Sequence, residues 1–172
     1  VAHFAEDIES ARIAAHALRP RAGAGGAEAL VLACGDAPCP VEGVQTFQPI
    51  GAYELPEYPG GRLLYPPFLE MLDYCHGHEP TDIHALTPGP SGLAALGVAR
   101  ILRLPAVATA DPAWLEQATQ RADQSGAEDL LWRYLVWFYN QAGRVLVPTD
   151  GLRRRLAARG VSSEKLRLAP GG

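Results

Sequence analysis

Residues 82–109 read DIHALTPGPSGLAALGVARILRLPAVAT, and this segment decides the fold class. Asp82–Leu86 is predicted to be a strand, and the Pro- and Gly-rich Thr87–Gly92 after it predicts a loop. The small residues that follow predict a closely packed helix, which Pro105 ends before a second strand at Ala106–Thr109. Strand, loop, helix and strand in this order are typical of a parallel sheet.

The same alternation extends over the rest of the chain. Further strands are predicted at Val1–Phe4, Leu30–Leu32, Val145–Val147 and Leu166–Leu168. Further helices are predicted from Ile8 to before Pro20, from Pro67 to Gly77, from a Ser125/Glu128 capping box through Phe138, and from Thr149 to Gly160. Residues 35–61 are dense in proline and glycine, which predicts irregular chain with short extended pieces near 44–47 and 63–64. We therefore expect a single α/β domain over residues 1–172, a Rossmann-like parallel sheet with helices on both faces in three layers.

Composition limits the class of protein. Apolar residues make up 48% and charged residues 20% of the 172 residues, which excludes an intrinsically disordered chain. No apolar run approaches about 18 residues and the first residues lack a signal-peptide pattern, so we expect neither a membrane span nor a leader. Lys and Arg number 15 against 19 Asp and Glu, and the net charge of -4 argues against broad nucleic-acid binding.

The cysteines indicate the compartment. Cys34, Cys39 and Cys75 are an odd number without a CxxC pair, which argues against a disulfide framework. A bridge between Cys34 and Cys39 around a small loop is the alternative. Because cytosolic disulfides are rare, we expect a reducing, cytoplasmic location and free thiols.

Four loops are expected to build the functional site, because ligands of parallel α/β sheets bind beyond the carboxyl ends of the strands. These loops are Ala5–Asp7, Thr87–Gly92, Thr109–Asp111 and Thr149–Asp150. Three of the four carry a carboxylate. A carboxylate at such an edge can hold a substrate hydroxyl or act as a base.

The Thr87–Gly92 loop has two interpretations. Its amides stand at a predicted helix N-terminus, where an anion or sugar hydroxyls bind well, and Gly89 and Gly92 would let a ligand approach the backbone. The loop also suits a rigid turn in which Ser91 caps the helix. It matches neither GxxxxGK[ST] nor GxGxxG, so no standard nucleotide-binding motif is predicted.

The carboxylates of the other loops are open to two interpretations as well. Asp111 precedes Pro112, a pair that suits a helix N-cap, while its position at a strand end suits substrate binding. Asp7 and Asp150 can likewise be caps or solvated charges rather than ligand contacts.

Three further clusters have two interpretations each. His76, His78, Glu79 and His84 have the chemistry of metal ligands, but histidine also suits the end of a helix, and His84 lies in a predicted strand. Aromatic residues from Trp132 to Tyr139 suit a stacking platform or a core-facing helix. The Arg153–Arg155 run suits the solvent side of its helix or anionic lipid headgroups. No GxSxG sequence is present, which argues against a serine hydrolase.

Four blocks of sequence form a distinctive combination. They are PTDIH at 80–84, TPGPSGL at 87–93 with LPAVAT at 104–109, LLWRY at 130–134 running to WFY at 137–139, and RVLVPT at 144–149 with 152–155 and 166–171 after it. Together they resemble the N-terminal half of glycosyltransferase family 4, whose members have two facing Rossmann-like domains, the GT-B fold. The resemblance covers about half of the chain.

The resemblance implies the acceptor-side domain of a retaining enzyme that transfers a sugar from a nucleotide-sugar donor to a lipid or sugar acceptor. It implies that the donor-binding residues lie in a second domain after Gly172, so residues 1–172 alone should transfer no sugar. It implies no metal or other cofactor. With the Arg153–Arg155 run it leads us to expect peripheral contact with the inner face of a membrane.

The resemblance also singles out site residues. Asp111 stands where the family has a histidine near the site, and it is the predicted catalytic residue, orienting an acceptor hydroxyl. The predicted substrate-binding residues are Pro88, Gly89, Ser91, Gly92, Asp7 and Thr149.

Two departures from the family pattern favour another class, and the first is Asp111 in place of the family's histidine. Family members also place glycines after the first strand, whereas this chain has Glu6-Asp7-Ile8-Glu9-Ser10, whose carboxylates would repel phosphate. The alternative is therefore a non-catalytic, degenerate binding or scaffold domain. A third hypothesis is a flavodoxin-like or phosphoester-hydrolysing domain that uses the histidines of the metal-like cluster.

Overall fold

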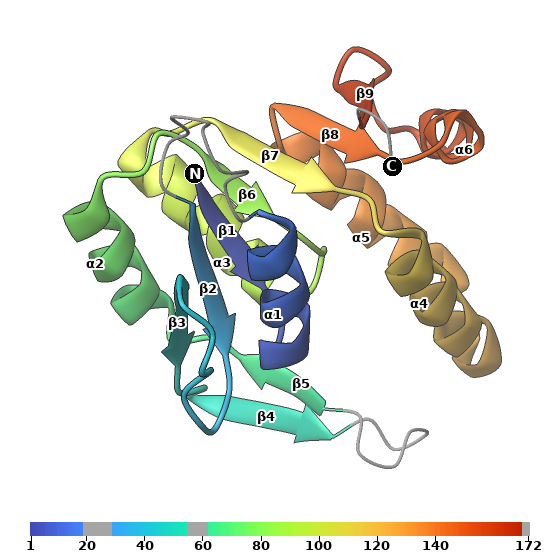
Figure 1. Cartoon of the computed structure of the whole chain (residues 1–172). Coiled ribbons are helices and arrows are strands. Elements are labelled where there is room, and N and C mark those ends of the chain that lie inside the picture. The colour runs from blue at the N-terminus through green and yellow to red at the C-terminus, as the bar shows by residue number, and fades with distance from the viewer. Residues whose placement is uncertain (19–28, 55–61, 170–172) are drawn as a thin grey trace.

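The computed structural model describes residues 1–18, 29–54 and 62–169. Its main sheet has seven parallel strands in the order β3-β2-β1-β6-β7-β8-β9 (Figure 1). These strands are β1 (Ala2–Ala5), β2 (Leu30–Cys34), β3 (Val44–Phe47), β6 (Ile83–Ala85), β7 (Ala106–Thr109), β8 (Arg144–Val147) and β9 (Leu166–Leu168). A separate antiparallel pair consists of β4 (Gly51–Glu54) and β5 (Arg62–Tyr65).

Helices cover both faces of the sheet, which confirms the expected Rossmann-like α/β architecture. They are α1 (Ile8–Ala17), α2 (Phe68–His78), α3 (Pro90–Leu102), α4 (Pro112–Ser125), α5 (Glu128–Gln141) and α6 (Asp150–Arg159). In Figure 1, α1 lies in front of the sheet and α3 behind it. The small side chains of α1 pack on β2, whereas the larger core lies on the face of α2, α3 and α5 and includes Phe4, Met71 and Phe138.

The order of the strands reverses direction next to β1. The chain proceeds from β1 outward to β2 and β3, then returns to place β6 on the other side of β1. Phe4 of β1 is level with Ala85 of β6, so the loops after these two strands leave the sheet side by side. Such a reversal point is where doubly wound sheets bind ligands.

Two predicted helix boundaries are wrong. Ser125 does not begin a helix; it is the last residue of α4, and its hydroxyl donates to carbonyl oxygens of its own helix at Arg121 and Ala122. The helix predicted to end at Gly77 continues to His78, because Glu79 takes the left-handed conformation with φ of 48°.

The helix α4 was not predicted from the sequence patterns. Asp111 is its N-cap, and Pro112 occupies the first turn, where a missing amide hydrogen costs nothing. Only Leu115 and Ala122 of this helix are buried, so the apolar periodicity that identifies a helix in a sequence is weak here.

Candidate functional site

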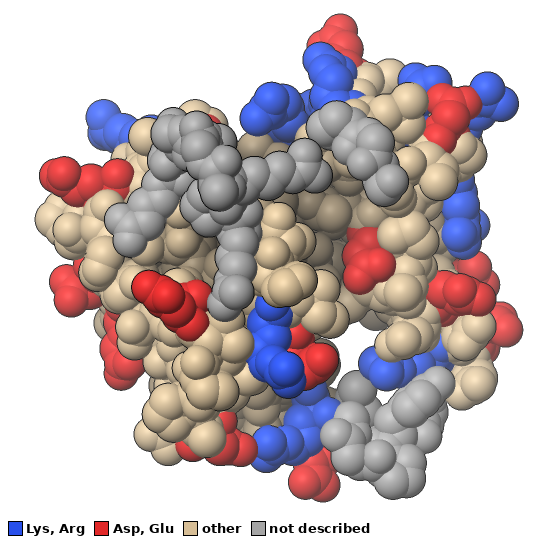
Figure 2. Space-filling model, in the orientation of Figure 1, with Lys and Arg blue, Asp and Glu red and all other residues tan. Residues whose placement is uncertain are grey.

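The carboxyl edge of the sheet holds a pocket of about 330 Å³, which we name the carboxyl-edge pocket. Three of the four predicted loops contribute to it. Its lining residues are Glu6, Asp7, Ser10, Arg62, Leu63, Leu64, Thr87, Gly89, Pro90, Asp111, Ala113, Trp114, Gln117 and Arg121. The face of the molecule drawn in Figure 2 is hollowed, and acidic and basic side chains are interspersed on it.

Two walls of the pocket come from segments outside the predicted loops. Arg62, Leu63 and Leu64 belong to β5, and Trp114 and Arg121 belong to α4. No local pattern in the sequence indicates these contributions, because they depend on how a hairpin and a helix pack against the edge of the sheet.

Glu6, the residue between β1 and the first helix, is joined to the loop after β6. Its Oε1 accepts from the Thr87 hydroxyl at 2.8 Å and from the Gly92 amide at 3.2 Å, and its Oε2 accepts from the Ser91 amide at 3.1 Å. Burial raises the pKa of Glu6, although these three hydrogen bonds act in the opposite direction. The carboxylate therefore occupies the N-terminus of α3.

This arrangement changes the interpretation of the predicted loop. The amides of Ser91 and Gly92 were expected to meet a ligand, but they donate to Glu6 instead, and neither residue lines the pocket. Ser91 is not the helix cap either, since Gly89 occupies the N-cap position. The reason is the parallel register of β1 and β6, which brings the carboxylate to the helix end.

The loop itself is held rigidly. Pro88 is buried, and its carbonyl oxygen accepts from the Tyr134 hydroxyl at 2.5 Å. Gly92 has no room for a side chain, because a Cβ there would lie 1.9 Å from the carbonyl oxygen of Thr87. Gly89 does line the pocket, as expected, whereas Pro88 does not.

Asp111 and Asp7 are both helix caps, and both line the pocket. Asp111 Oδ1 accepts from the Ala113 amide at 3.0 Å and caps α4, and the residue lines the pocket. Asp7 Oδ1 accepts from the Ser10 amide at 2.7 Å and caps α1, and Asp7 also lines the pocket. Within the described ranges each leaves its second carboxylate oxygen without a hydrogen-bond partner. Their roles in ligand binding remain predictions.

Thr149 lies apart from the lining of the pocket. It follows β8 and caps α6, accepting from the Leu152 amide at 3.2 Å. The next residue, Asp150, is ion-paired with Arg153 and Arg154 of the same helix. The guanidinium of Arg155 lies 5.2 Å from the centre of the Trp132 ring, so all three residues of the arginine run have partners within the protein.

The other clusters are placed as follows. Trp132, Phe138 and Tyr139 are buried, which confirms the core interpretation of the aromatic segment for these three residues. His78 Nδ1 lies 2.8 Å from the Tyr74 carbonyl oxygen at the end of α2. In the described part of the chain, no three His, Cys, Asp or Glu side chains gather as a metal site would require. None of the described helices has the length and apolarity to cross a bilayer.

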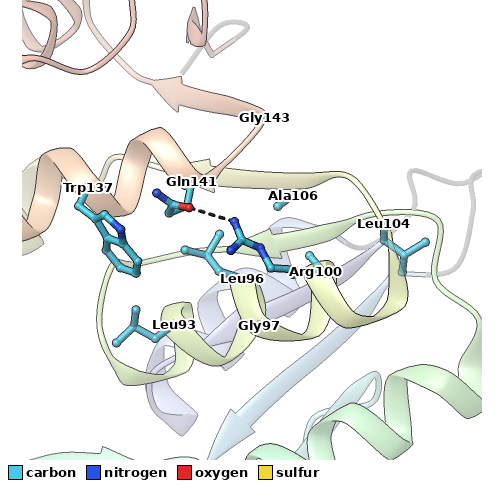
Figure 3. Close-up of a pocket in the computed structure, with 10 residues that line it drawn as sticks. Leu93, Leu96, Gly97, Arg100, Leu104, Ala106, Trp137, Gln141 and Gly143 are labelled. Carbon is cyan, nitrogen blue, oxygen red and sulfur yellow. Dashed lines mark hydrogen bonds between the residues drawn. The ribbon is translucent and has the colours of Figure 1, made fainter.

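A second pocket, of about 370 Å³, lies between α3 and α5 (Figure 3). Leu93, Leu96 and Trp137 form much of its lining, and Arg100, its charged lining residue, donates to Gln141 at 3.1 Å. Ala106 and Gly143 place this pocket towards the amino ends of the strands. We therefore assign the functional site to the smaller carboxyl-edge pocket, which has the position and the polar groups of a ligand site.

The carboxyl-edge pocket has the chemistry of a hydroxyl-binding site. Carboxylate oxygens of Asp7 and Asp111 accept hydrogen bonds from hydroxyl groups, and Arg62 and Arg121 are the cationic lining residues. Trp114 contributes an aromatic ring of the kind that packs against the apolar face of a ligand.

Comparison with known proteins gives one family. The sequence model of the family described as Glycosyltransferase Family 4 matches residues 13–172. A search among curated proteins finds no match.

Proposed function

The chain belongs to glycosyltransferase family 4, and from that membership we propose that its carboxyl-edge pocket binds the acceptor of a sugar-transfer reaction. In this proposal the donor is a nucleotide sugar, the acceptor is a lipid or a sugar, and the configuration of the transferred sugar is retained. The donor is held mainly by a second domain after Gly172. The observation that carries the proposal is the position of Asp111, which lines the pocket at the carboxyl edge of the sheet and has one carboxylate oxygen without a hydrogen-bond partner among the described residues.

In the proposed reaction this chain positions the acceptor hydroxyl. A hydroxyl of the acceptor attacks the first carbon of the donor sugar, the bond from that carbon to the diphosphate breaks, and the hydroxyl proton leaves with the diphosphate. Asp111 Oδ2 accepts the hydrogen bond of the attacking hydroxyl and fixes its direction. Oδ1 stays bonded to the Ala113 amide, so the side chain has one orientation.

The α4 helix supports this role. Because Asp111 is the N-cap and Trp114 lies in the first turn, the hydrogen-bond acceptor and the aromatic wall are held on one rigid element. A site on a helix end keeps its geometry better than a site on a loop.

The test is Asp111→Asn in the enzyme that contains this chain. Asparagine caps helices about as well as aspartate, so α4 should stay intact while the charge and one acceptor are lost. We expect sugar transfer to fall by about 100-fold or more with the melting temperature little changed. Asp123→Asn, an exposed change farther along α4, is the matched control. An unchanged rate in Asp111→Asn would remove Asp111 from the site.

A non-catalytic binding or scaffold domain is the second candidate, and the observation that favours it is the occupation of the α3 N-terminus by Glu6. Sugar transfer by the complete enzyme separates the two functions, since a scaffold domain gives none at any donor concentration.

Location in the cytoplasm, at the inner face of a membrane, is part of the proposal. Arg153 and Arg154 share the single carboxylate of Asp150, and the Arg154 side chain is 78% exposed, so the arginine run keeps a net positive charge for this contact.

A further inference from the structure

We propose that Glu6 determines which class of ligand the carboxyl-edge pocket accepts. Its carboxylate occupies the N-terminus of α3 and excludes phosphate there, so the ligand presents an uncharged, hydroxyl-bearing group at this position. This inference rests on the proposed function for the identity of that ligand as the acceptor, and it assigns to Glu6 the role of a specificity-determining residue.

The backbone amides of the first turn of α3 are all used within the protein. A phosphate at a helix N-terminus binds the free amides of the first turn. In α3 the first residue is Pro90, which has no amide hydrogen. The amides of Ser91 and Gly92 donate to Glu6, and the amide of Leu93 donates to the Gly89 carbonyl oxygen at 3.0 Å. No backbone amide of this turn is left for an anionic ligand.

The space beside these amides is filled as well. A Cβ added at Gly89 would lie 2.4 Å from Oε1 of Glu6, so the carboxylate occupies the volume next to the loop backbone. The Thr87 hydroxyl, at 2.8 Å from the same oxygen, fixes the side chain in this place. A phosphate group would have to displace Glu6 before it could reach the helix.

The charges around the pocket also disfavour a phosphate group. Asp7 and Asp111 line it together with Glu6, so an anion near α3 would meet three carboxylates. Of the two lining arginines, Arg62 is ion-paired with Asp36 at 3.0 Å, and Arg121 also has an interaction within the protein. A phosphate oxygen can only accept hydrogen bonds from its neighbours, whereas a sugar hydroxyl can donate to these carboxylates. The lining therefore favours a neutral polyhydroxyl group over a phosphorylated one.

The experiment is a titration of the isotopically labelled chain with inorganic phosphate, followed through the amide resonances of Ser91 and Gly92. We expect the wild type to show no saturable shift of these two amides. In Glu6→Ala the same amides should shift saturably, with phosphate binding at least about tenfold tighter than in the wild type. Glu9→Ala is the matched control, because Glu9 is an exposed carboxylate one turn away on α1, paired with Arg12. It should behave as the wild type.

Two results would overturn the inference. One is saturable phosphate binding at Ser91 and Gly92 in the wild type, a measurement that does not depend on whether the variant folds. The other is a folded Glu6→Ala chain that still binds no phosphate at these amides. Both results are independent of the transfer assay with Asp111→Asn. The phosphate titration tests the role of Glu6, and the transfer assay tests the acceptor site.

Discussion

The histidine pair on β1 and β6 should make the stability of this domain depend on pH. His3 and His84 are register partners on adjacent strands, and their Nδ1 atoms lie 2.8 Å apart. His84 Nε2 lies 2.6 Å from the Thr109 hydroxyl on β7. A hydrogen bond between two imidazole nitrogens needs one of them to be an unprotonated acceptor, so the pair is built for neutral rings.

The size of the effect follows from the pKa values. Burial lowers the pKa of each histidine from 6.5 to about 4, and for His3 the neighbouring His84 adds to this. The unfolded chain therefore binds the protons more tightly, so the contribution to stability is complete above pH 6.5 and is lost as the pH falls towards 4. For one imidazole the loss at about pH 5 is about 2 kcal/mol, and for the two histidines together it is about 4 kcal/mol. A domain stability of about 5–15 kcal/mol makes this loss measurable.

Urea unfolding at about pH 7.5 and about pH 5 tests this expectation, and a loss of about 4 kcal/mol moves the midpoint by about 2 M. The double variant His3→Asn with His84→Asn should lose most of the difference between the two pH values. His16→Gln, an exposed change on α1, should retain it. The raised pKa of Glu6 acts in the opposite sense, since its contribution is lost as the pH rises, and subtracting variant from wild type removes it. Equal pH dependence in wild type and double variant would refute the reasoning.

Three other predictions concern the loops of the site. Gly92→Ala should cost about 3 kcal/mol or more or prevent folding, because its Cβ would lie 1.9 Å from the Thr87 carbonyl oxygen; a near-normal urea midpoint would contradict the loop geometry. Tyr134→Phe should cost about 1 kcal/mol by removing the hydrogen bond to Pro88, measured as the change in unfolding free energy, and no loss would show that this bond adds nothing. Thr149→Ala should lower stability by about 1 kcal/mol through the lost cap and should leave acceptor binding unchanged. Weaker acceptor binding in calorimetry would show that Thr149 belongs to the site.

The elements that the sequence predicted well are those whose signal is local. The segments Leu30–Leu32 and Val145–Val147 are short apolar runs, and the helix after Thr149 has a cap and a terminal glycine in the sequence. The helix α4 was missed because its stability comes from Asp111, Pro112 and packing against α5 rather than from an apolar stripe. Ser125 was misassigned for a related reason, since a hydroxyl near a helix end can bond backward as well as forward.

The residues of the candidate site also fall into those that the sequence predicted and those that it did not. The rule that ligands bind at the carboxyl edge identified the loops that carry Asp7, Gly89 and Asp111, because strand ends are visible in the sequence. The walls from β5 and α4 were not predicted, since nothing in residues 62–64 or 114–121 records which edge of the sheet they will cover. The contact between Glu6 and Ser91 spans 85 positions, and no local pattern encodes it.

The arrangement around Glu6 bears on whether the loop after β1 is a decayed version of a glycine-rich one. In a decayed loop we would expect the amides at the N-terminus of α3 to have no partner, or the Glu6 carboxylate to lie in solvent. Here Glu6 satisfies two amides and a hydroxyl, and Gly89 leaves the space in which the carboxylate lies. A group with three hydrogen bonds and a matched cavity in the opposite loop is an integral part of the edge. Since that edge also presents Asp111 with an uncommitted oxygen, the absence of glycines after β1 changes which ligand the pocket favours rather than abolishing the pocket.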